Sequence, residues 1–378
     1  MIAPEEFALD TAMLLEDIEA FLDRFVVYPS IHARRAHTLW IAHTHLMECW
    51  ESTPRIAFLS PEPGSGKSRA LEVTEPLVPR PIHSVNTTPA YLFRKVSDEA
   101  GLPTILYDEV DTVFGKGVRG NGDTEGVRGM INAGHRKGAT AGRCVVRGKL
   151  IETEELAAYC PVALAGLNDL PDTLMSRSVV VRMRRRTAEE SIEPWRPRIN
   201  GPEAAKLLAR LQEWAADGKQ YLVGEDWWPK MPKGVEDRDA DIWEALLAVA
   251  DLAGPGWAND ARVSAVTLVT DSKTRQPSLG ILLLHDIKKV FARARTDKLT
   301  TDGVISGLIN TPDSPWSRIR KGEAIDPTYL ASKLRDYDIG PKAQRIKDDV
   351  FKGYSRAQFE DAWKRYPLPV DDEEDGGL

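Results

Sequence analysis

Residues 55–69 read RIAFLSPEPGSGKSR and hold the strongest structural signal in the sequence. The apolar run RIAFLS predicts a buried strand, and the residues from Ser68 onward predict a helix that ends before Pro76. Between them, Gly64 and Gly66 allow backbone N–H groups to curl around an anion. Because a helix start also favours negative charge, this order of strand, loop and helix predicts a phosphate-binding loop.

The loop supplies the candidate ligands for ATP and Mg²⁺. Lys67 is expected to reach the β- and γ-phosphates, and the Ser68 hydroxyl is expected to ligate Mg²⁺. The common pattern G-x-x-x-x-G-K-[ST] has a glycine where this chain has Pro61, so the first half of the loop departs from it. The residues predicted to contact the nucleotide are Pro63, Gly64, Ser65, Gly66, Lys67, Ser68 and Arg69.

A second apolar run, PTILYDEV at 103–110, ends in acids and follows the loop by about 40 residues. Nucleotide hydrolysis requires acids at the carboxyl end of such a strand, close to the phosphates. Asp108 is therefore predicted to hold Mg²⁺ together with Ser68, and Glu109 to polarise the attacking water. Asp111 is a further candidate for the metal shell.

Two later residues complete a predicted catalytic set of Lys67, Glu109, Asn168 and Arg177. Asn168 follows the apolar run 161–166 and would lie between the γ-phosphate and the water, although a turn-forming asparagine is the alternative. Arg177 follows a short predicted helix, and in a ring it would reach the γ-phosphate bound by a neighbouring copy. A surface ion pair is the alternative for Arg177.

Strands that alternate with helices predict an α/β fold with a parallel sheet. Within it, 114–126 is expected to be a glycine-rich loop, and 254–280 is expected to be rich in loops. We expect five segments in all: an N-terminal helical segment at 1–50, a P-loop ATPase core at 51–190, a helical linker or lid at 191–280, a small helical C-terminal domain at 281–366 and a disordered acidic tail at 367–378.

Two windows are basic although the chain carries a net charge of −7. Five acids at 371–375 account for most of that excess, since the other residues include 50 basic and 52 acidic side chains. Residues 134–149 and residues 177–186 each hold five basic side chains and no acid. Both windows suit contact with nucleic-acid phosphates, and a solvated strand edge is the alternative for 177–186.

The first basic window overlaps a predicted hairpin at 144–153, whose two short strands flank a tight turn. In a ring, the hairpin tip would project into the central hole and contact a nucleic-acid backbone. An ordinary exposed turn is the alternative. The predicted nucleic-acid contacts are Arg136, Lys137, Arg147 and Lys149.

The chain has no apolar run near the ~20 residues that span a bilayer. Its first residues, MIAPEEFALD, lack the basic start of a secretory signal. Cys49, Cys144 and Cys160 form neither a disulfide framework nor a CxxC pair. We therefore expect a cytoplasmic protein without a membrane partner.

The order of the loop lysine, strand-ending acids, inserted hairpin, Asn168 and Arg177 resembles an AAA+-type P-loop ATPase. The segment LMSRS at 174–178 is similar to the arginine-finger segment of minichromosome-maintenance helicases. In this resemblance, Asn168 and Arg177 match by position alone. The residues that match the family motif itself are Lys67, Ser68, Asp108 and Glu109, which implies ATP and Mg²⁺ as ligands.

Six phrases also resemble the family called domain of unknown function 3631, across roughly residues 35–366. That family occurs mainly in actinobacteria and their phages, often beside or fused to primase-like modules, which implies a replication-associated ATPase and makes a primase a candidate partner. Residues 281–366 look like a winged-helix-type unit with a β-wing near 345–354, a type that binds DNA or docks proteins. The phrases are LWIAHTH, SPEPGSGKSRALE, MINAGHRKGAT, ALAGLNDLPDTLMSRSVVVRMRRR, DSPWSRIRKGEAIDP and KGYSRAQFEDAW.

The expected function is that of a Mg²⁺-dependent ATPase that assembles into a ring, a hexamer, and moves DNA through a basic pore. This is the activity of a replicative-type helicase of a phage or mobile element. One alternative is a loader or regulatory ATPase that remodels a protein partner without moving along DNA. Another is a scaffold that binds ATP without hydrolysing it, in which Glu109→Gln would have no effect.

Overall fold

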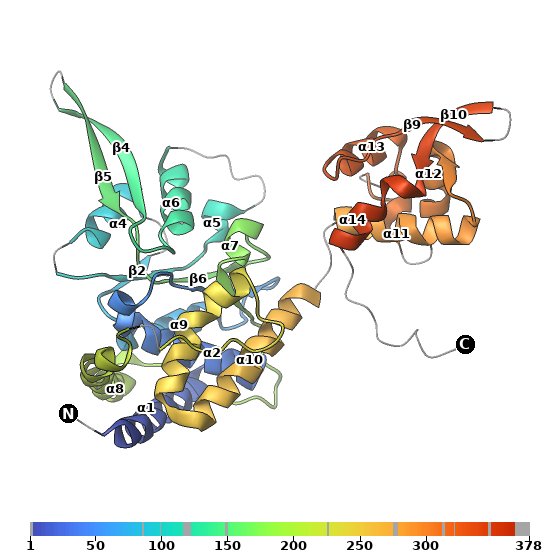
Figure 1. Cartoon of the computed structure of the whole chain (residues 1–378). Coiled ribbons are helices and arrows are strands. Elements are labelled where there is room, and N and C mark those ends of the chain that lie inside the picture. The colour runs from blue at the N-terminus through green and yellow to red at the C-terminus, as the bar shows by residue number, and fades with distance from the viewer. Residues whose placement is uncertain are drawn as a thin grey trace. The chain divides into compact units, whose positions relative to one another are not determined.

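The computed structural model describes residues 3–84, 87–98, 100–115, 122–147, 150–224, 227–274, 279–311, 314–320, 322–346 and 349–366. They belong to two compact units, Met1–Ser272 and Lys273–Leu378 (Figure 1). The cores of the two units share no residue. Each unit is therefore described by itself.

The first unit is built on a five-stranded sheet whose strands are all parallel. Every residue of β1 and of β3 is buried, as in sheets that are covered on both faces. The predicted α/β class with a parallel sheet is confirmed. In spatial order the strands are β2 (Pro81–Ser84), β3 (Thr104–Tyr107), β6 (Val162–Leu167), β1 (Arg55–Ser60) and β7 (Ser178–Arg182).

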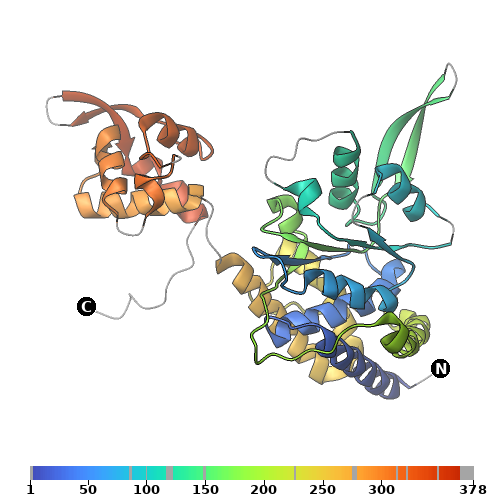
Figure 2. The same ribbon diagram turned by 180° about the vertical axis from the view of Figure 1, so that it is seen from behind.

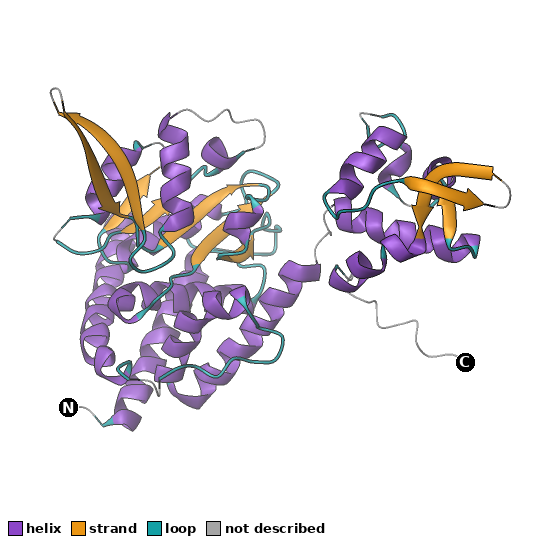
Figure 3. Ribbon diagram, turned by 45° about the horizontal axis from the view of Figure 1, so that its top comes forward, coloured by secondary structure: helices purple, strands orange, loops and turns teal. Residues whose placement is uncertain are grey.

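The two faces of the sheet belong to different cores, because successive side chains of a strand point to opposite faces. Ile56 and Phe58 of β1 lie in the larger core, and Ala57 and Leu59 lie in the smaller one. The larger core is formed with a thick layer of helices (Figure 3). These helices are α1 (Pro4–Phe25), α2 (Ile31–His43), α3 (Lys67–Thr74), α8 (Pro197–Gly218), α9 (Arg238–Leu252) and α10 (Gly254–Thr274).

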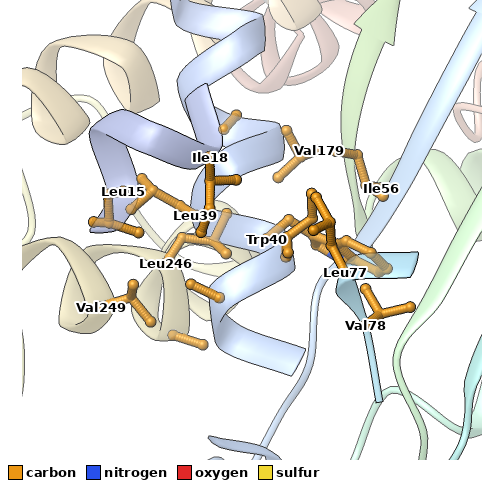
Figure 4. Packing of buried hydrophobic residues seen from close by; sticks show 14 of the residues in the cluster. Leu15, Ile18, Leu39, Trp40, Ile56, Leu77, Val78, Val179, Leu246 and Val249 are labelled. Atoms are coloured by element: carbon orange, nitrogen blue, oxygen red, sulfur yellow. The ribbon is translucent and has the colours of Figure 1, made fainter. Parts of the chain in front are cut away.

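Figure 4 shows how this layer packs, with Ile18, Leu39 and Trp40 of the helices facing Ile56 and Val179 of the sheet. The opposite face is covered by short elements. They are α4 (Pro89–Val96), α5 (Asp111–Phe114), α6 (Gly122–Ala133) and α7 (Asp172–Met175).

Two expected loops contain helices. The sequence predicts a loop-rich segment at 254–280, but α10 begins at Gly254, since the first turn of a helix tolerates proline. Its apolar residues recur every fourth position and are buried, at Trp257, Ala261, Ala265 and Val269. Likewise, α6 begins inside the glycine-rich stretch 114–126 that was expected to be a loop.

The predicted hairpin is present and is longer than 144–153. It consists of β4 (Thr140–Arg147) and β5 (Leu150–Ala157), which pair as a separate antiparallel ribbon. The ribbon extends away from the helical layer in both views (Figures 1 and 2). Lys149 lies outside the described residues. The backbone register places Arg143 opposite Glu154, so the acids of β5 accompany the basic residues of β4.

The second unit packs helices around a small antiparallel sheet in the order β8-β10-β9. At its centre, Trp316 Nε1 donates to the buried Asp286 carboxylate at 2.7 Å. The wing expected near 345–354 corresponds to the β9–β10 hairpin. The elements are α11 (Leu279–Ala294), β8 (Lys298–Thr300), α12 (Thr301–Ile309), α13 (Pro327–Arg335), β9 (Lys342–Ile346), β10 (Asp349–Ser355) and α14 (Glu360–Arg365).

Side-chain caps explain several helix starts in both units. Ser30 accepts from Ala33 N at the start of α2, and Thr88 and Asp326 play the same role for α4 and α13. In α4 and α13 the cap is followed by proline, which suits the first helical position. Among the described residues, no helix is both long and apolar enough to cross a membrane.

Candidate nucleotide site at the carboxyl edge of the sheet

The loop of residues 61–66 connects the carboxyl end of β1 to the first residue of α3, Lys67. Gly64 and Gly66 have φ angles of +73° and +84°, which side chains other than glycine rarely adopt. Gly66 is the N-cap of α3 in the left-handed conformation, so the loop turns sharply into the helix. The strand, the glycine loop and the helix start thus have the order that an anion-binding loop requires.

The Lys67 ammonium folds back over this loop. Its Nζ donates to the Glu62 carbonyl and to Ser65 Oγ, each at 3.1 Å. Partial burial lowers the pKa of Lys67, and the nearby carboxylates of Asp108 and Asp111 oppose that shift. The lysine of the loop and the acids after β3 are therefore electrostatic neighbours, although 41 residues separate Lys67 from Asp108 in the sequence.

The acids after β3 are held by backbone contacts. Asp108 N donates to the Ser84 carbonyl at 2.9 Å, and Glu109 N donates to Asp108 Oδ1 at 2.8 Å. Asp111 Oδ1 accepts from Leu167 N at 2.9 Å, so this carboxylate joins α5 to β6 as well as facing Lys67. Glu109 is exposed and Asp108 is half-buried, which leaves both within reach of a ligand.

Asn168 lies beside the loop, because its N–H donates to the carbonyl of Ser60, the last residue of β1, at 3.1 Å. Asn168 and Glu109 have positive φ angles of +60° and +53°. Six described residues other than glycine share this property, and two of the six are these predicted catalytic residues. Strained backbone of this kind gathers at functional sites, where the surrounding structure holds it in place.

Arg185 also contacts the loop, although its sequence pattern predicts no individual role for it. Its Nε donates to the Pro63 carbonyl at 2.8 Å, and its guanidinium lies 3.8 Å from the Glu62 carboxylate. The contact arises because β7, which precedes Arg185, pairs with β1, which precedes the loop. Arg182 instead forms an ion pair with Asp169, so the basic residues of 177–186 make at least two separate kinds of contact.

Arg177 lies at the opposite edge of the sheet. It precedes the first residue of β7, and in a parallel sheet that amino end is remote from the carboxyl end of β1. Its guanidinium donates to the Thr173 carbonyl at 2.5 Å and to His135 Nε2 at 3.3 Å. The structure therefore brings Lys67, Asp108, Glu109 and Asn168 to one edge and leaves Arg177 at the other.

The predicted nucleic-acid contacts are also divided. Arg136 and Lys137 lie at the amino edge with Arg177, where they line a cavity of about 480 Å³. Lys137 Nζ donates to the Glu48 carbonyl at 2.8 Å. Arg147 is the last residue of β4, at the far end of the hairpin. These positions do not form a single patch within one copy of the chain.

The predicted ligands for Mg²⁺ are two in number, Ser68 and Asp108. Among the described residues, no group of three or more His, Cys, Asp or Glu side chains could hold a metal ion. Mg²⁺ in nucleotide sites retains water and phosphate oxygens and takes only one or two protein ligands. An exposed Ser68 at the start of α3 and a half-buried Asp108 near Lys67 satisfy that requirement.

Comparison with known proteins gives a family for the chain. The model of the family described as "Protein of unknown function (DUF3631)" matches residues 182–366. A protein of Saccharopolyspora erythraea, described as an uncharacterized 28.9 kDa protein in the xis 5′ region, is 36% identical over 186 residues. The matched part covers 49% of this chain and 68% of that protein. The chain belongs to the DUF3631 family.

The DUF3631 match begins at the end of β7 and includes Arg185, the helices α8 to α10 and the second unit. It is shorter than the expected 35–366 and does not include the loop of residues 61–66. A solved structure described as the A form apo structure of the NrS-1 C-terminal region, residues 305–718, has a TM-score of 0.42 and 11% identity. The match covers 90% of this chain and 74% of the NrS-1 chain. A likeness of this size does not establish a shared fold.

Proposed function

We propose that this chain is a Mg²⁺-dependent ATPase with an AAA+-type P-loop core, which forms a ring and uses ATP to move along DNA. The observation that carries the proposal is the meeting of three segments at one sheet edge. The glycine loop with Lys67, the acids Asp108 and Glu109, and the strained Asn168 all follow neighbouring strands there. Ligands of parallel sheets bind outside the carboxyl ends of the strands, as this arrangement requires.

In this proposal the loop N–H groups and Lys67 bind the phosphates of ATP. Lys67 would exchange its contacts with Glu62 and Ser65 for phosphate oxygens, which supply the negative charge that its partly buried ammonium lacks. Ser68 and Asp108 would hold Mg²⁺, which neutralises charge that develops on the phosphates. Glu109 would accept the proton of the attacking water, and Asn168 would orient that water.

Arg177 supports the ring. A guanidinium at the amino edge cannot reach a γ-phosphate at the carboxyl edge of its own sheet, but a neighbouring copy can present one to it. An arginine supplied in this way stabilises charge in the transition state of phosphoryl transfer. Within one copy, Arg136 and Lys137 lie apart from the hairpin end. A ring would bring these residues and the hairpin ends of several copies together.

The second unit supports contact with DNA or with a protein. Its helices and its three-stranded antiparallel sheet with the β9–β10 hairpin agree with the winged-helix type. The basic residues Lys333 and Arg335 lie in the last turn of α13. We propose that this unit binds the partner on which the ATPase acts.

The proposal is tested by ATP hydrolysis at low salt, with and without single-stranded and duplex DNA. We expect turnover that DNA stimulates and that Lys67→Ala abolishes, because the variant cannot hold the phosphates. Lys95→Ala, an exchange on α4 away from the loop, is the matched control. Wild-type protein without turnover, or a Lys67→Ala variant as active as the wild type, would contradict the proposal.

A second function, remodelling of a protein partner, is favoured by the charge of the hairpin. Residues 140–157 hold three basic and three acidic side chains, so the hairpin is neutral as a whole. A neutral ribbon attracts DNA phosphates less than a basic one. If the Arg147→Ala, Lys149→Ala double variant keeps full stimulation by DNA, or if DNA never stimulates turnover, the remodelling function is the better account.

A further inference from the structure

Three tryptophans form a chain of ring contacts that leads from the core of the first unit to its surface. Trp50 is fully buried, and its ring centroid lies 5.7 Å from that of Trp227. Trp227 stacks on Trp228 with 5.0 Å between centroids and an angle of 10° between planes. Trp228 nevertheless remains 53% exposed. A large aromatic ring that is fixed from behind and open to solvent is a ready stacking surface for another ring.

Trp228 lines the cavity of about 480 Å³ at the amino edge of the sheet, which we call the Trp228 pocket. Arg136 and Lys137 line it from the segment after α6, and Arg238 lines it from the first turn of α9. A cavity of this volume falls in the range that holds small ligands. The pocket therefore combines an aromatic plane with several cations.

The pocket also has acidic groups. Asp241 and Glu244 of α9 line it together with Glu51. Burial and the charges of Asp241 and Glu51 raise the pKa of Glu244 to about 7. A carboxyl group of this kind donates a hydrogen bond when protonated and accepts one when ionised, so it can pair with the polar edge of a nucleobase.

We propose that the Trp228 pocket binds a nucleotide with an unpaired base, which stacks on Trp228 while Arg136 and Arg238 hold its phosphate. An aromatic plane recognises a base without regard to sequence, and it requires that the base be unstacked and unpaired. Because the pocket holds acidic as well as basic side chains, a ligand that binds through its charge alone is disfavoured. A nucleotide offers a ring, hydrogen-bonding groups and a phosphate together. A residue of single-stranded DNA and a free mononucleotide share this chemistry.

This site is separate from the phosphate-binding loop, because the two lie at opposite edges of the sheet. The inference rests on the proposed function only in taking DNA as a partner, since the pocket would hold the strand on which the ATPase acts. It adds Trp228 and Arg238 to the predicted contacts Arg136 and Lys137. Binding at this site does not need hydrolysis, so the two proposals fail in different experiments.

The test measures the affinity of a fluorescently labelled oligothymidylate for the full chain by anisotropy. All proteins carry Lys67→Ala, so that the loop contributes little to binding. Trp228→Ala is expected to weaken binding about tenfold, as loss of one stacked base does. Trp228→Phe should restore most of the affinity, and Tyr91→Ala, which removes another exposed aromatic ring of the unit, should leave it unchanged.

Arg238→Ala is the second variant and does not depend on the fold tolerating a change at Trp228. It should weaken binding about tenfold and reduce the dependence of log affinity on log salt by about one unit. Competition with unlabelled thymidine monophosphate distinguishes the two ligand sources. Displacement by the mononucleotide indicates a nucleotide pocket, and resistance to it indicates a site for the strand; both support the proposal.

The proposal is overturned if Trp228→Ala and Arg238→Ala both leave oligothymidylate affinity within about twofold of the parent protein. Absence of ATP turnover in the wild type would contradict the proposed function and leave this binding result valid.

Discussion

At the scale of single residues, the candidate site is marked by strain and by one charge. Glu109 and Asn168 have positive φ angles although neither is glycine. The cost is about 1–2 kcal/mol for Glu109 and smaller for Asn168, because asparagine adopts this conformation more readily. The N–H group of each residue donates a hydrogen bond that holds it in place, to Asp108 Oδ1 from Glu109 and to the Ser60 carbonyl from Asn168. Beside them, the Lys67 ammonium donates to two oxygens of its own loop, and the carboxylates of Asp108 and Asp111 lie near it.

A substitution at Arg185 tests how the loop of residues 61–66 contributes to ATP binding without changing a residue of that loop. Arg185→Ala should weaken ATP binding about threefold to tenfold, because the loop loses its contact at the Pro63 carbonyl and becomes less ordered before ATP binds. Binding of a fluorescent ATP analogue measures the effect. Arg184→Ala is the matched control, as Arg184 is exposed and one residue away. Equal affinity of the two variants would contradict the assigned role.

Much of the site at this scale could be predicted from the sequence. Lys67, Ser68, Asp108 and Glu109 each follow or precede an apolar strand in a spacing with a known chemical use. Arg185 could not be predicted, because its contact with the loop depends on β7 pairing with β1. Sequence spacing does not reveal which strands are neighbours, so five clustered arginines could be read only as one charged window.

At the scale of elements, the helical layer depends on histidines that are buried in the neutral form. His37 of α2 bonds to Tyr28 and to Thr74 Oγ1, and burial lowers its pKa to about 3. His43 bonds to Thr53 Oγ1 and to the Trp40 carbonyl, and burial lowers its pKa to about 3 as well. These rings join the helices to α3 and to the segment before β1.

The first unit should therefore lose stability in mild acid. Both pKa values lie below the value of 6.5 for an exposed histidine, so the unfolded chain takes up protons first as the pH falls. The stabilisation is complete above pH 6.5 and decreases as the pH falls from there toward 3. The two histidines together should cost about 2 kcal/mol between pH 6.5 and about pH 5.5.

Urea unfolding at the two pH values measures this change. Glu244 opposes this loss of stability. Because its pKa is raised, the folded state takes up a proton at Glu244 over the same pH range, before the unfolded state does. Glu244→Gln should thus steepen the loss of stability. Equal free energies of unfolding at both pH values in the wild type and in Glu244→Gln would show that the histidines are not buried as described.

Element types were predicted better than element lengths. Fully apolar runs such as RIAFLS identified the buried strands, since a parallel sheet covered on both faces needs no polar alternation. Helix α10 occupies most of a range for which the sequence predicts loops, and Gly254 and Pro255 are tolerated there because they lie where the helix starts. The hairpin was predicted too short because glycine and acidic residues at its base do not have the composition of strands.

At the scale of the whole molecule, the two units have separate cores. The second unit surrounds Trp316 and Asp286 with apolar residues of its own helices and strands. We expect residues 273–366 to fold without the first unit, with cooperative unfolding seen by circular dichroism. Trp316→Ala should destabilise this fragment by about 3–5 kcal/mol, because it opens a cavity and removes the Trp316 donor from the buried Asp286 Oδ2.

The exposed Lys288→Ala is the control for that fragment, and it should change stability by less than about 0.5 kcal/mol. A fragment that remains unfolded in its wild-type sequence would contradict the separation. The structure divides the chain between Ser272 and Lys273, near the expected boundary between residues 280 and 281.

The ring can be tested by mixing two inactive chains. Arg177→Ala should bind ATP normally and lose most of its turnover, because its own phosphate-binding loop is intact. A mixture with Lys67→Ala should recover part of the turnover, since the Lys67→Ala copies supply Arg177 to the loops of the others. Steady-state hydrolysis of the mixture measures this. A mixture no more active than either variant alone would contradict an arginine contributed by a neighbouring copy.

The central claim is that the carboxyl edge of the sheet hydrolyses ATP, and Glu109→Gln tests it most directly. The variant retains the loop, Lys67 and Asp108, so it should bind ATP with wild-type affinity. It should also lose turnover by about a hundredfold or more, because glutamine cannot accept the proton of the attacking water. Affinity and turnover measured on the same preparation decide the question. Unchanged turnover in Glu109→Gln, with ATP bound normally, would contradict the claim.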